Sequence, residues 1–199
     1  MKRLVRNELP GRSAMSIPPG ISVEIRLAAV EDAGRIATTH VASWKATYPG
    51  IVPQAYLDSL RIEEFADRWR SGILNPSGAK IYVADCGGTI CGFVSGGPAR
   101  AEIPGFSSEL YAIYLNPDAC LRGIGSRLFR EIAKDLQSSR HRGMYVWVLK
   151  DNPSRGFYER VGGRPLTAAE IEIGGKTLTE VSYGWEDLSA VAEQLPSPP

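Results

Sequence analysis

The spacing of hydrophobic positions changes several times along the 199-residue chain, and each change predicts a new element. Apolar and polar residues alternate in VEIRLA, residues 23–28, which is typical of a half-buried strand. In residues 32–46 the apolar positions fall three or four apart, which predicts a helix that ends before Pro49 and Gly50. A second helical pattern covers residues 54–72 and ends before the turn NPSG.

The middle of the chain predicts strands. KIYVADCGGTICGFVSGG, residues 80–97, contains two β-rich runs around Gly87-Gly88, the pattern of a tight hairpin. ELYAIYL, residues 109–115, and MYVWVL, residues 144–149, are apolar on both faces, which favours central positions in a sheet. A helix lies between these two strands, so we expect them to run parallel through a right-handed crossover.

The last part of the chain predicts a short helix and a hairpin. PSRGFYERVGG, residues 153–163, reads as a helix that ends at glycines, and residues 169–185 predict two strands turning at Gly174-Gly175. The order is strand, two helices, three strands, helix, strand, helix, two strands. It predicts an α/β fold with a mixed central sheet and helices on both faces.

Composition sets limits on class and location. A hydrophobic content of 43% is that of a globular protein, and we expect one domain over residues 21–187 with disordered tails at 1–20 and 188–199. The formal net charge of +1 argues against a broad surface for nucleic acid, and no apolar run reaches the length of a membrane span. Three cysteines without CxxC spacing and the absence of a signal-peptide pattern favour the cytoplasm.

A glycine-flanked turn, RGIG at residues 122–125, precedes the helix with the most regular apolar stripe. That stripe consists of Leu128, Phe129, Ile132 and Leu136. Glycine lets the backbone approach a bulky ligand, and the first N–H groups of a helix have no intrahelical partners, so an anion is the natural ligand there.

Three interpretations of this turn compete. A dinucleotide-binding fold needs a third glycine, and a nucleotide triphosphatase loop needs Gly-Lys-Ser/Thr, whereas Ser126-Arg127 follow here. The turn by itself also fits a purely structural role, in which the glycines only allow the helix to pack against the sheet.

Two segments together resemble the coenzyme A-binding half of the GNAT superfamily of N-acetyltransferases, LYAIYLNPDACLRGIGSRL at 110–128 and DNPSRGFYERVGG at 151–163. In that family a strand and a Pro-containing turn lead to a Gln/Arg-x-x-Gly-x-Gly/Ala loop, and Gly123 and Gly125 match its two small positions. The family's later Asn-x-x-x-x-Phe-Tyr-Glu-x-x-Gly motif is matched by Asn152, Phe157, Tyr158, Glu159 and Gly162. The segment HVASWKATYPGIVPQAYLDSL also looks like a form common in small bacterial members, and the resemblance covers about residues 23–186.

The loop departs from the family pattern at two positions. Cys120 stands where the family usually has Gln or Arg, and Leu121 stands where many members have another glycine. This leaves one side-chain hydrogen bond to the coenzyme pyrophosphate unaccounted for, while the backbone amides remain and Arg122 offers a positive charge.

The resemblance implies an acetyl-CoA-dependent N-acetyltransferase with a GNAT-like sheet, in which a primary amine of a small molecule or protein attacks the thioester directly, without a metal. It also implies that strands 109–115 and 144–149 splay at their carboxyl ends and that the Leu115 amide faces the acetyl oxygen. The coenzyme contacts it implies are Ile113, Leu115, Arg122, Gly123, Ile124, Gly125, Ser126, Asn152 and Tyr158.

Tyr158 and Glu109 are the candidate catalytic residues. A phenol with a pKa of ~10 can reprotonate a departing thiolate of pKa ~8.5, so Tyr158 is a candidate general acid. The family resemblance assigns the same role to this tyrosine. The alternative is that Tyr158 is a core aromatic on a short helix. Glu109 could draw a proton from the amine through water, whereas a glutamate at a strand start is more often only solvated.

The acceptor side is less defined by the sequence. Trp44 and Tyr48, where the first helix meets a Pro-Gly loop, are candidate walls of an acceptor pocket, although helix packing also explains Trp44. His40 lies on the apolar stripe of that helix and fits a core histidine better than a catalytic one. Asn152 is a candidate N-cap of the short helix as well as a coenzyme contact.

Two other functions and one assembly stay open from sequence. A catalytically silent acetyl-CoA-binding sensor would keep the fold without turnover, and a nicotinamide-dependent oxidoreductase would bind a dinucleotide instead. Two chains could also pair as a homodimer through the last strands. The amine acceptor is not identified by these residues.

Overall fold

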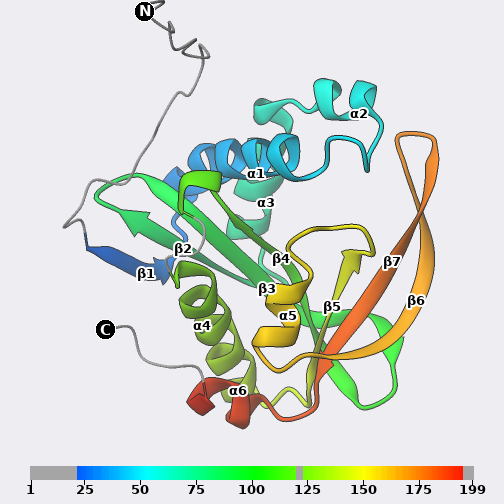
Figure 1. Cartoon of the computed structure of the whole chain (residues 1–199). Helices are drawn as coiled ribbons and strands as arrows, with labels where there is room; N and C mark the ends of the chain where they lie inside the picture. Colours follow the sequence, from blue (N-terminus) through cyan, green and yellow to red (C-terminus); the bar gives the residue numbers. More distant parts are fainter. Residues whose placement is uncertain (1–21, 120–122, 195–199) are drawn as a thin grey trace, which may run out of the picture.

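The computed structural model describes residues 22–119 and 123–194 and is built around a seven-stranded sheet (Figure 1). The strand order is β1-β2-β3-β4-β5-β7-β6, and every neighbouring pair is antiparallel except β4 beside β5. The strands are β1 Val23–Leu27, β2 Lys80–Cys86, β3 Ile90–Ile103, β4 Phe106–Leu115, β5 Met144–Leu149, β6 Arg164–Ile173 and β7 Lys176–Trp185. The predicted α/β class and the parallel β4/β5 pair are confirmed.

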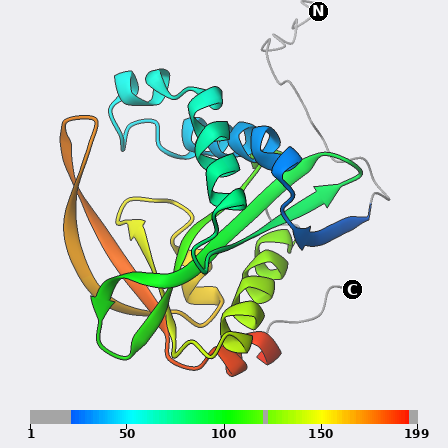
Figure 2. The same cartoon turned by 180° about the vertical axis from the view of Figure 1, so that it is seen from behind.

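Helices cover both faces of the sheet, as predicted (Figures 1 and 2). The three on one face are α1 Ala33–Thr47, α2 Gln54–Ser59 and α3 Ile62–Leu74, and those on the other are α4 Ile124–Ser138, α5 Gly156–Arg160 and α6 Leu188–Gln194. The predicted apolar stripe of α4 is confirmed, because Leu128, Phe129, Ile132 and Leu136 are at most 1% exposed. They pack with the sheet in the largest hydrophobic cluster.

The single helix predicted over residues 54–72 is two helices. Leu60 and Arg61 have extended backbones and separate α2 from α3. The break lets Leu57 and Leu60 both enter an apolar cluster under α2, which we call the α2 cluster. Its buried members are Val41, Tyr48, Val52, Leu57, Leu60, Leu149 and Leu178.

The prediction of a disordered tail at 188–199 is wrong for residues 188–194, which form α6. Leu188 and Val191 are buried in the cluster that contains α4. The Asp187 carboxylate accepts hydrogen bonds from the Ser189 N–H at 2.8 Å and the Ser189 hydroxyl at 2.5 Å, which caps the helix start. Residues 195–199 and the predicted tail at 1–20 lie outside the described residues.

Two of the three cysteines are paired. Cys86 and Cys91 form a disulfide across the β2/β3 hairpin, five residues apart. Their spacing is not that of a CxxC motif, so the pair was not predicted from sequence. The inference from cysteine usage to a reducing compartment therefore loses its support, and the cytoplasmic location stays a prediction.

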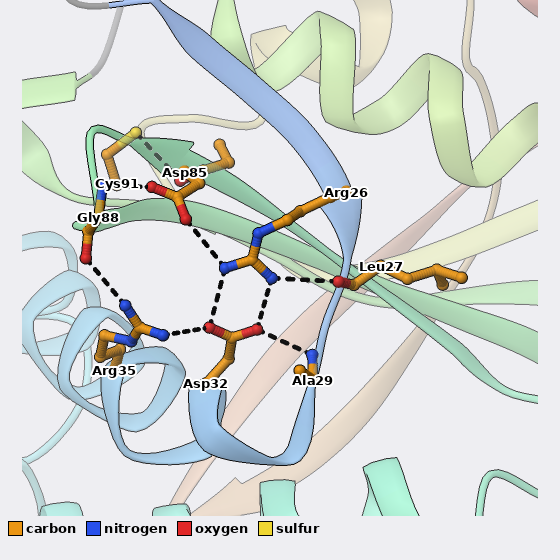
Figure 3. A network of polar contacts seen from close by, with 9 residues as sticks. Arg26, Leu27, Ala29, Asp32, Arg35, Asp85, Gly88 and Cys91 are labelled. Atoms are coloured by element: carbon orange, nitrogen blue, oxygen red, sulfur yellow. Dashed lines mark hydrogen bonds and ion pairs between the residues drawn. The ribbon is translucent and has the colours of Figure 1, made fainter.

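A buried carboxylate joins β1, the start of α1 and the β2/β3 hairpin (Figure 3). Asp32 is 1% exposed and accepts hydrogen bonds from Arg26 at 2.7 and 3.1 Å, Arg35 at 2.7 Å and the Ala29 N–H at 2.8 Å. Arg26 also contacts Asp85 at 2.9 Å. The hydrogen bonds from Arg26 hold the pKa of Asp32 below its usual value despite burial. This network fixes α1, which carries the residues near the site, to the edge of the sheet.

We predict that Asp32→Asn lowers the free energy of unfolding by about 2–4 kcal/mol, because it leaves Arg26 without its buried partner. Asp67→Asn, which removes a surface partner of Arg70, should cost less than about 1 kcal/mol. The pKa of the Asp32 carboxyl is lower in the folded state than in the unfolded state. Its ionised form therefore stabilises the fold above the usual carboxyl pKa, and this stabilisation is lost as the pH falls through the folded-state pKa. Urea unfolding at pH 7 and at about pH 3 should show the gap between wild type and Asp32→Asn closing in acid. An equal gap at both values contradicts this assignment.

Candidate active site

The central strands β4 and β5 separate soon after they meet. They pair only at Ser108 with Met144 and at Glu109 with Tyr145. Beyond that point β4 continues along β3, where Leu115 lies opposite Gly92. The splay of these two strands at their carboxyl ends, which the family resemblance implied, is therefore confirmed (Figure 1).

The splay leaves backbone donors of β4 without a strand partner. The Asn116 N–H donates to the Cys91 carbonyl of β3 at 2.9 Å. Backbone groups alternate in direction along a strand, so the N–H groups of Ile113 and Leu115 point away from β3, toward the opening. The Leu115 carbonyl is engaged, because it accepts a hydrogen bond from the Ser43 hydroxyl of α1.

A bulge in β4 sets which side chains face which layer. Leu110 pairs with Gly96 and Ala112 with Ser95, so Tyr111 is an extra residue in β4. Leu110 before the bulge and Ile113 after it both pack on the α4 side. Because side chains alternate, Glu109 faces the α1 side of the sheet.

The predicted pyrophosphate turn opens α4. Gly123 is the N-cap with a φ of +74°, and no side chain of the described residues caps the helix. The Arg127 N–H donates to the Gly123 carbonyl at 3.1 Å, and the N–H groups of residues 124–126 precede that bond at the helix start. These residues include the predicted contacts Ile124, Gly125 and Ser126. Arg122, together with Cys120 and Leu121, lies outside the described residues.

The two glycines of the turn serve different needs. A Cβ at Gly123 would meet no described atom within 4 Å, so the positive φ explains this glycine. A Cβ at Gly125 would lie 3.2 Å from Leu115 Cδ1 and 3.4 Å from Phe157 Cε2. Gly125 therefore lets the start of α4 approach the end of β4 and α5, which supports a packing role at this position. The first N–H groups of α4, which no described side chain caps, fit a diphosphate.

Tyr158 of α5 is buried with its hydroxyl unpaired. Its side chain is only 8% exposed and its ring stacks on Tyr183, with centroids 6.0 Å apart. The Tyr158 hydroxyl has no hydrogen-bond partner within residues 22–119 and 123–194. Burial, with a further contribution from Tyr48, raises the pKa of Tyr158. Tyr158 is thus both a core aromatic and a protonated phenol at neutral pH.

Asn152 connects the turn before α5 to the end of α1. Its amide nitrogen donates to the Tyr48 hydroxyl at 3.0 Å, and its amide oxygen accepts from the Ser154 N–H at 2.8 Å. The prediction that Asn152 is the N-cap of the short helix is wrong, because α5 begins later, with Arg155 as its N-cap. Asn152 instead holds the preceding turn and orients Tyr48.

Aromatic side chains surround the end of α1. The rings of Trp44 and Tyr48 are 4.9 Å apart and those of Trp44 and Tyr56 6.0 Å apart. The Trp44 indole nitrogen is buried and has no partner of standard hydrogen-bond geometry in the part of the chain described. Burial raises the pKa of Tyr114 on β4, and the neighbouring phenols of Tyr48 and Tyr158 raise it further. The structure thus brings Trp44 and Tyr48 together with Tyr158.

His40 is a core residue, as the sequence indicated. The Trp69 indole N–H donates to its Nδ1 at 3.3 Å, and its ring stacks on Tyr114 with centroids 4.6 Å apart. Burial lowers the pKa of His40 to about 4, so the imidazole is neutral at pH 7.

Glu109 is not a solvated residue at a strand start, and that expectation is wrong. It lies inside β4 and is 3% exposed. Arg100 donates to it from its side chain at 2.5 and 3.1 Å and from its backbone N–H at 3.1 Å, and the Tyr145 hydroxyl donates at 3.1 Å. Its role as the general base stays a prediction, and its carboxylate is held by these partners.

Glu180 is a residue that the sequence analysis did not single out. It lies on β7 opposite Leu149 and is half-buried. Burial, with a further contribution from Glu109, raises the pKa of Glu180. One feature of the sequence could have identified Glu180. It lies two residues after Leu178 in a predicted strand, so the carboxylate shares a face with an apolar side chain.

Comparisons with known proteins identify the class of enzyme that has this fold and this site. A family model described as FR47-like protein matches residues 100–171. An uncharacterized N-acetyltransferase of Bacillus subtilis, YuaI, is 41% identical over 174 residues, which cover 87% of this chain and 98% of that protein. A spermidine N(1)-acetyltransferase of Thermoplasma acidophilum is 26% identical over 141 residues, covering 69% of this chain and 84% of that protein.

A solved structure has the same fold. The PaiA N-acetyltransferase of Thermoplasma acidophilum, crystallised with coenzyme A, superposes with a TM-score of 0.65 at 24% identity, covering 80% of this chain and 98% of that one. The chain described here belongs to the GNAT superfamily and is an acetyl-CoA-dependent N-acetyltransferase. Within the described residues, no helix is both long and apolar enough to cross a bilayer.

We predict that Gly125→Leu raises the Kd for coenzyme A by at least about tenfold, because a bulky side chain pushes the start of α4 away from β4 and α5. Gly34→Leu is the matched control, since Gly34 is also the second residue of a helix and a Cβ there would meet no described atom within 4 Å. The control should leave the Kd unchanged and stabilise the fold by about 0.5–1 kcal/mol. Isothermal titration with coenzyme A measures both variants, and equal affinities contradict the packing argument.

Proposed function

We propose that the enzyme transfers the acetyl group of acetyl-CoA directly to a primary amine, with Tyr158 as the general acid. One observation carries this proposal: the Tyr158 side chain is largely buried, and its hydroxyl has no hydrogen-bond partner among the described residues. Most polar groups of buried side chains are hydrogen-bonded, and a substrate atom that completes the bonding of this hydroxyl accounts for the exception.

The donor is held by backbone groups at two places. The N–H groups of residues 124–126 bind the pyrophosphate at the positive end of α4. The opening between β4 and β5 receives the rest of the coenzyme, with the N–H groups of Ile113 and Leu115 as donors. The Leu115 N–H stabilises the negative charge that develops on the acetyl oxygen. The helix start and Leu115 are already adjacent, because Gly125 packs against the Leu115 side chain.

The chemistry needs no enzyme-bound intermediate. The amine, after losing one proton to solvent, attacks the thioester carbon and forms a tetrahedral adduct. The carbon–sulfur bond then breaks, and the departing thiolate takes the proton of the Tyr158 hydroxyl. The phenolate then takes the second proton that the nitrogen releases, which restores the Tyr158 phenol. Burial keeps Tyr158 protonated at neutral pH and also raises the proton affinity of the thiolate that forms beside it.

The acceptor approaches from the α1 side. Trp44 and Tyr48 form aromatic walls there, and aromatic faces attract alkylammonium groups. A relative that is 26% identical acts on spermidine, which supports the inclusion of polyamines among the acceptors tested. Mass detection of acetylated products from a panel of mono-, di- and polyamines identifies the acceptor.

Pairing of two chains also stays a prediction. β6 is an edge strand of the sheet and most of its residues are exposed. Its outer backbone groups are those through which a second copy could extend the sheet.

We predict that Tyr158→Phe lowers kcat by at least about 10²-fold and leaves the Kd for acetyl-CoA within about threefold, because only proton donation is lost. Tyr183→Phe is the control, since its hydroxyl donates to Glu159 at 2.8 Å and the ring stacks on Tyr158 without a proposed role in proton transfer. Steady-state rates and titrations separate turnover from binding. A kcat for Tyr158→Phe equal to that of wild type removes Tyr158 from the mechanism.

Direct attack predicts that no acetyl group is left on the protein. Incubation with acetyl-CoA alone, followed by intact-mass measurement, should give the unmodified mass, and initial rates at varied donor and amine should give intersecting lines. A stable acetylated enzyme that forwards its acetyl group to an amine, with parallel lines, would show a covalent route instead.

A further inference from the structure

Glu180 lies beside the acceptor side of the site. Side chains directly opposite each other on neighbouring strands lie on the same face of a sheet, so Glu180 shares a face with Leu149 of β5. Leu178, two residues earlier on β7, is on that face as well. Both leucines pack in the α2 cluster with Tyr48, whose hydroxyl is bonded to Asn152. Glu180 therefore borders the aromatic walls assigned to the acceptor.

Two glutamates on this side of the sheet differ in their partners. Glu109 also faces the α1 side, and its charge is neutralised by Arg100. Glu180 makes no hydrogen bond and no ion pair with any residue that the structure describes. Removing a carboxylate from water without a partner is unfavourable, and here burial and Glu109 raise the pKa of Glu180. A bound cation that is not part of the described chain would offset both the burial of the Glu180 carboxylate and its repulsion by Glu109.

Three cations of the neighbouring segments have partners of their own. Arg100 is bound to Glu109, and the Lys176 ammonium donates to the Ile51 carbonyl at 2.8 Å. Arg155 donates to the Lys150 carbonyl at 3.0 Å. The acceptor of the proposed reaction is itself a cation before it loses its proton, and it arrives on this face.

We propose that Glu180 binds the ammonium group of the acceptor and selects alkylamines that carry no carboxylate next to the amine. This inference rests on the proposed function. The same carboxylate repels an amino acid through its α-carboxylate, so diamines and polyamines are preferred over amino acids.

The test compares two acceptors in wild type and Glu180→Gln. The probes are 1,4-diaminobutane, which is cationic at pH 7, and 4-methylaniline, which is uncharged there. We expect Glu180→Gln to lower kcat/KM for the diamine by about 10- to 100-fold, mainly through KM, because a charge-assisted contact is lost. The value for 4-methylaniline and the Kd for acetyl-CoA should change less than about twofold, since neither carries the contacted ammonium.

Glu170→Gln is the matched control. Glu170 is exposed on β6 opposite Thr179, so it lies on the other face of the same hairpin, and its removal changes the protein charge equally. It should behave as wild type with both amines. Glu180→Asp, which keeps the charge on a shorter side chain, should recover most of the activity with the diamine. Because Glu180 has no partner to lose among the described residues, the Tm of Glu180→Gln should be no lower than that of wild type.

The possible outcomes separate the role assigned to Glu180 from the proposed transfer reaction. A drop of equal size for both amines, or no drop for the diamine, overturns the assignment of Glu180 and leaves the proposed transfer reaction intact. A wild-type enzyme that binds acetyl-CoA and acetylates neither amine nor any member of the panel overturns the proposed function and this inference together. If Glu180→Gln fails to fold, Glu180→Ala takes its place, and an unchanged KM for the diamine in that variant overturns the assignment.

Discussion

The separation of β4 from β5 after two paired positions is the constraint on which the site depends. A strand in the middle of a sheet normally satisfies its backbone on both sides, and N–H groups left unpaired in a protein interior are unfavourable. Ile113 and Leu115 turn their N–H groups into this opening, which is why we propose that the coenzyme binds there. The start of α4 and the short helix α5 meet the same opening, because Gly125 lies against Leu115 and Phe157.

The residues that we propose to contact substrate differ from the supporting residues in their hydrogen-bond partners. Asn152 and Glu109 each have several partners, and both hold neighbouring groups in place. The hydroxyl of Tyr158 and the carboxylate of Glu180 have none among the described residues, although both side chains are at least half-buried. Polar groups of side chains buried to this extent usually have partners, which is why we propose that substrate atoms contact these two.

The sequence predicted the parts of the molecule that depend on local pattern. The stripe of α4 and the strand at residues 144–149 follow from spacing alone, and the bounds of β5 agree with the prediction. The splay and the positions of Gly123 and Tyr158 came from the family motifs. Sequence patterns therefore predicted the elements that form the proposed donor side of the site.

The remaining features depend on contacts between distant segments. Neither glycine nor proline marks the break at Leu60, which is set by burial of that leucine in the α2 cluster. Glu109 owes its burial to Arg100 on the preceding strand, and Glu180 owes its place to a register with Leu149. Such pairings involve register and loop geometry that residue spacing does not specify. The acceptor side was therefore only partly visible in the sequence.

A crystal structure with a non-hydrolysable thioether analogue of acetyl-CoA tests the central claim most directly. We expect the pyrophosphate to contact the N–H groups of residues 124–126. The acetyl oxygen should lie about 3 Å from the Leu115 nitrogen, and the sulfur should lie within hydrogen-bonding distance of the Tyr158 hydroxyl. An analogue bound elsewhere, with the gap between β4 and β5 filled by the protein's own side chains, would contradict it.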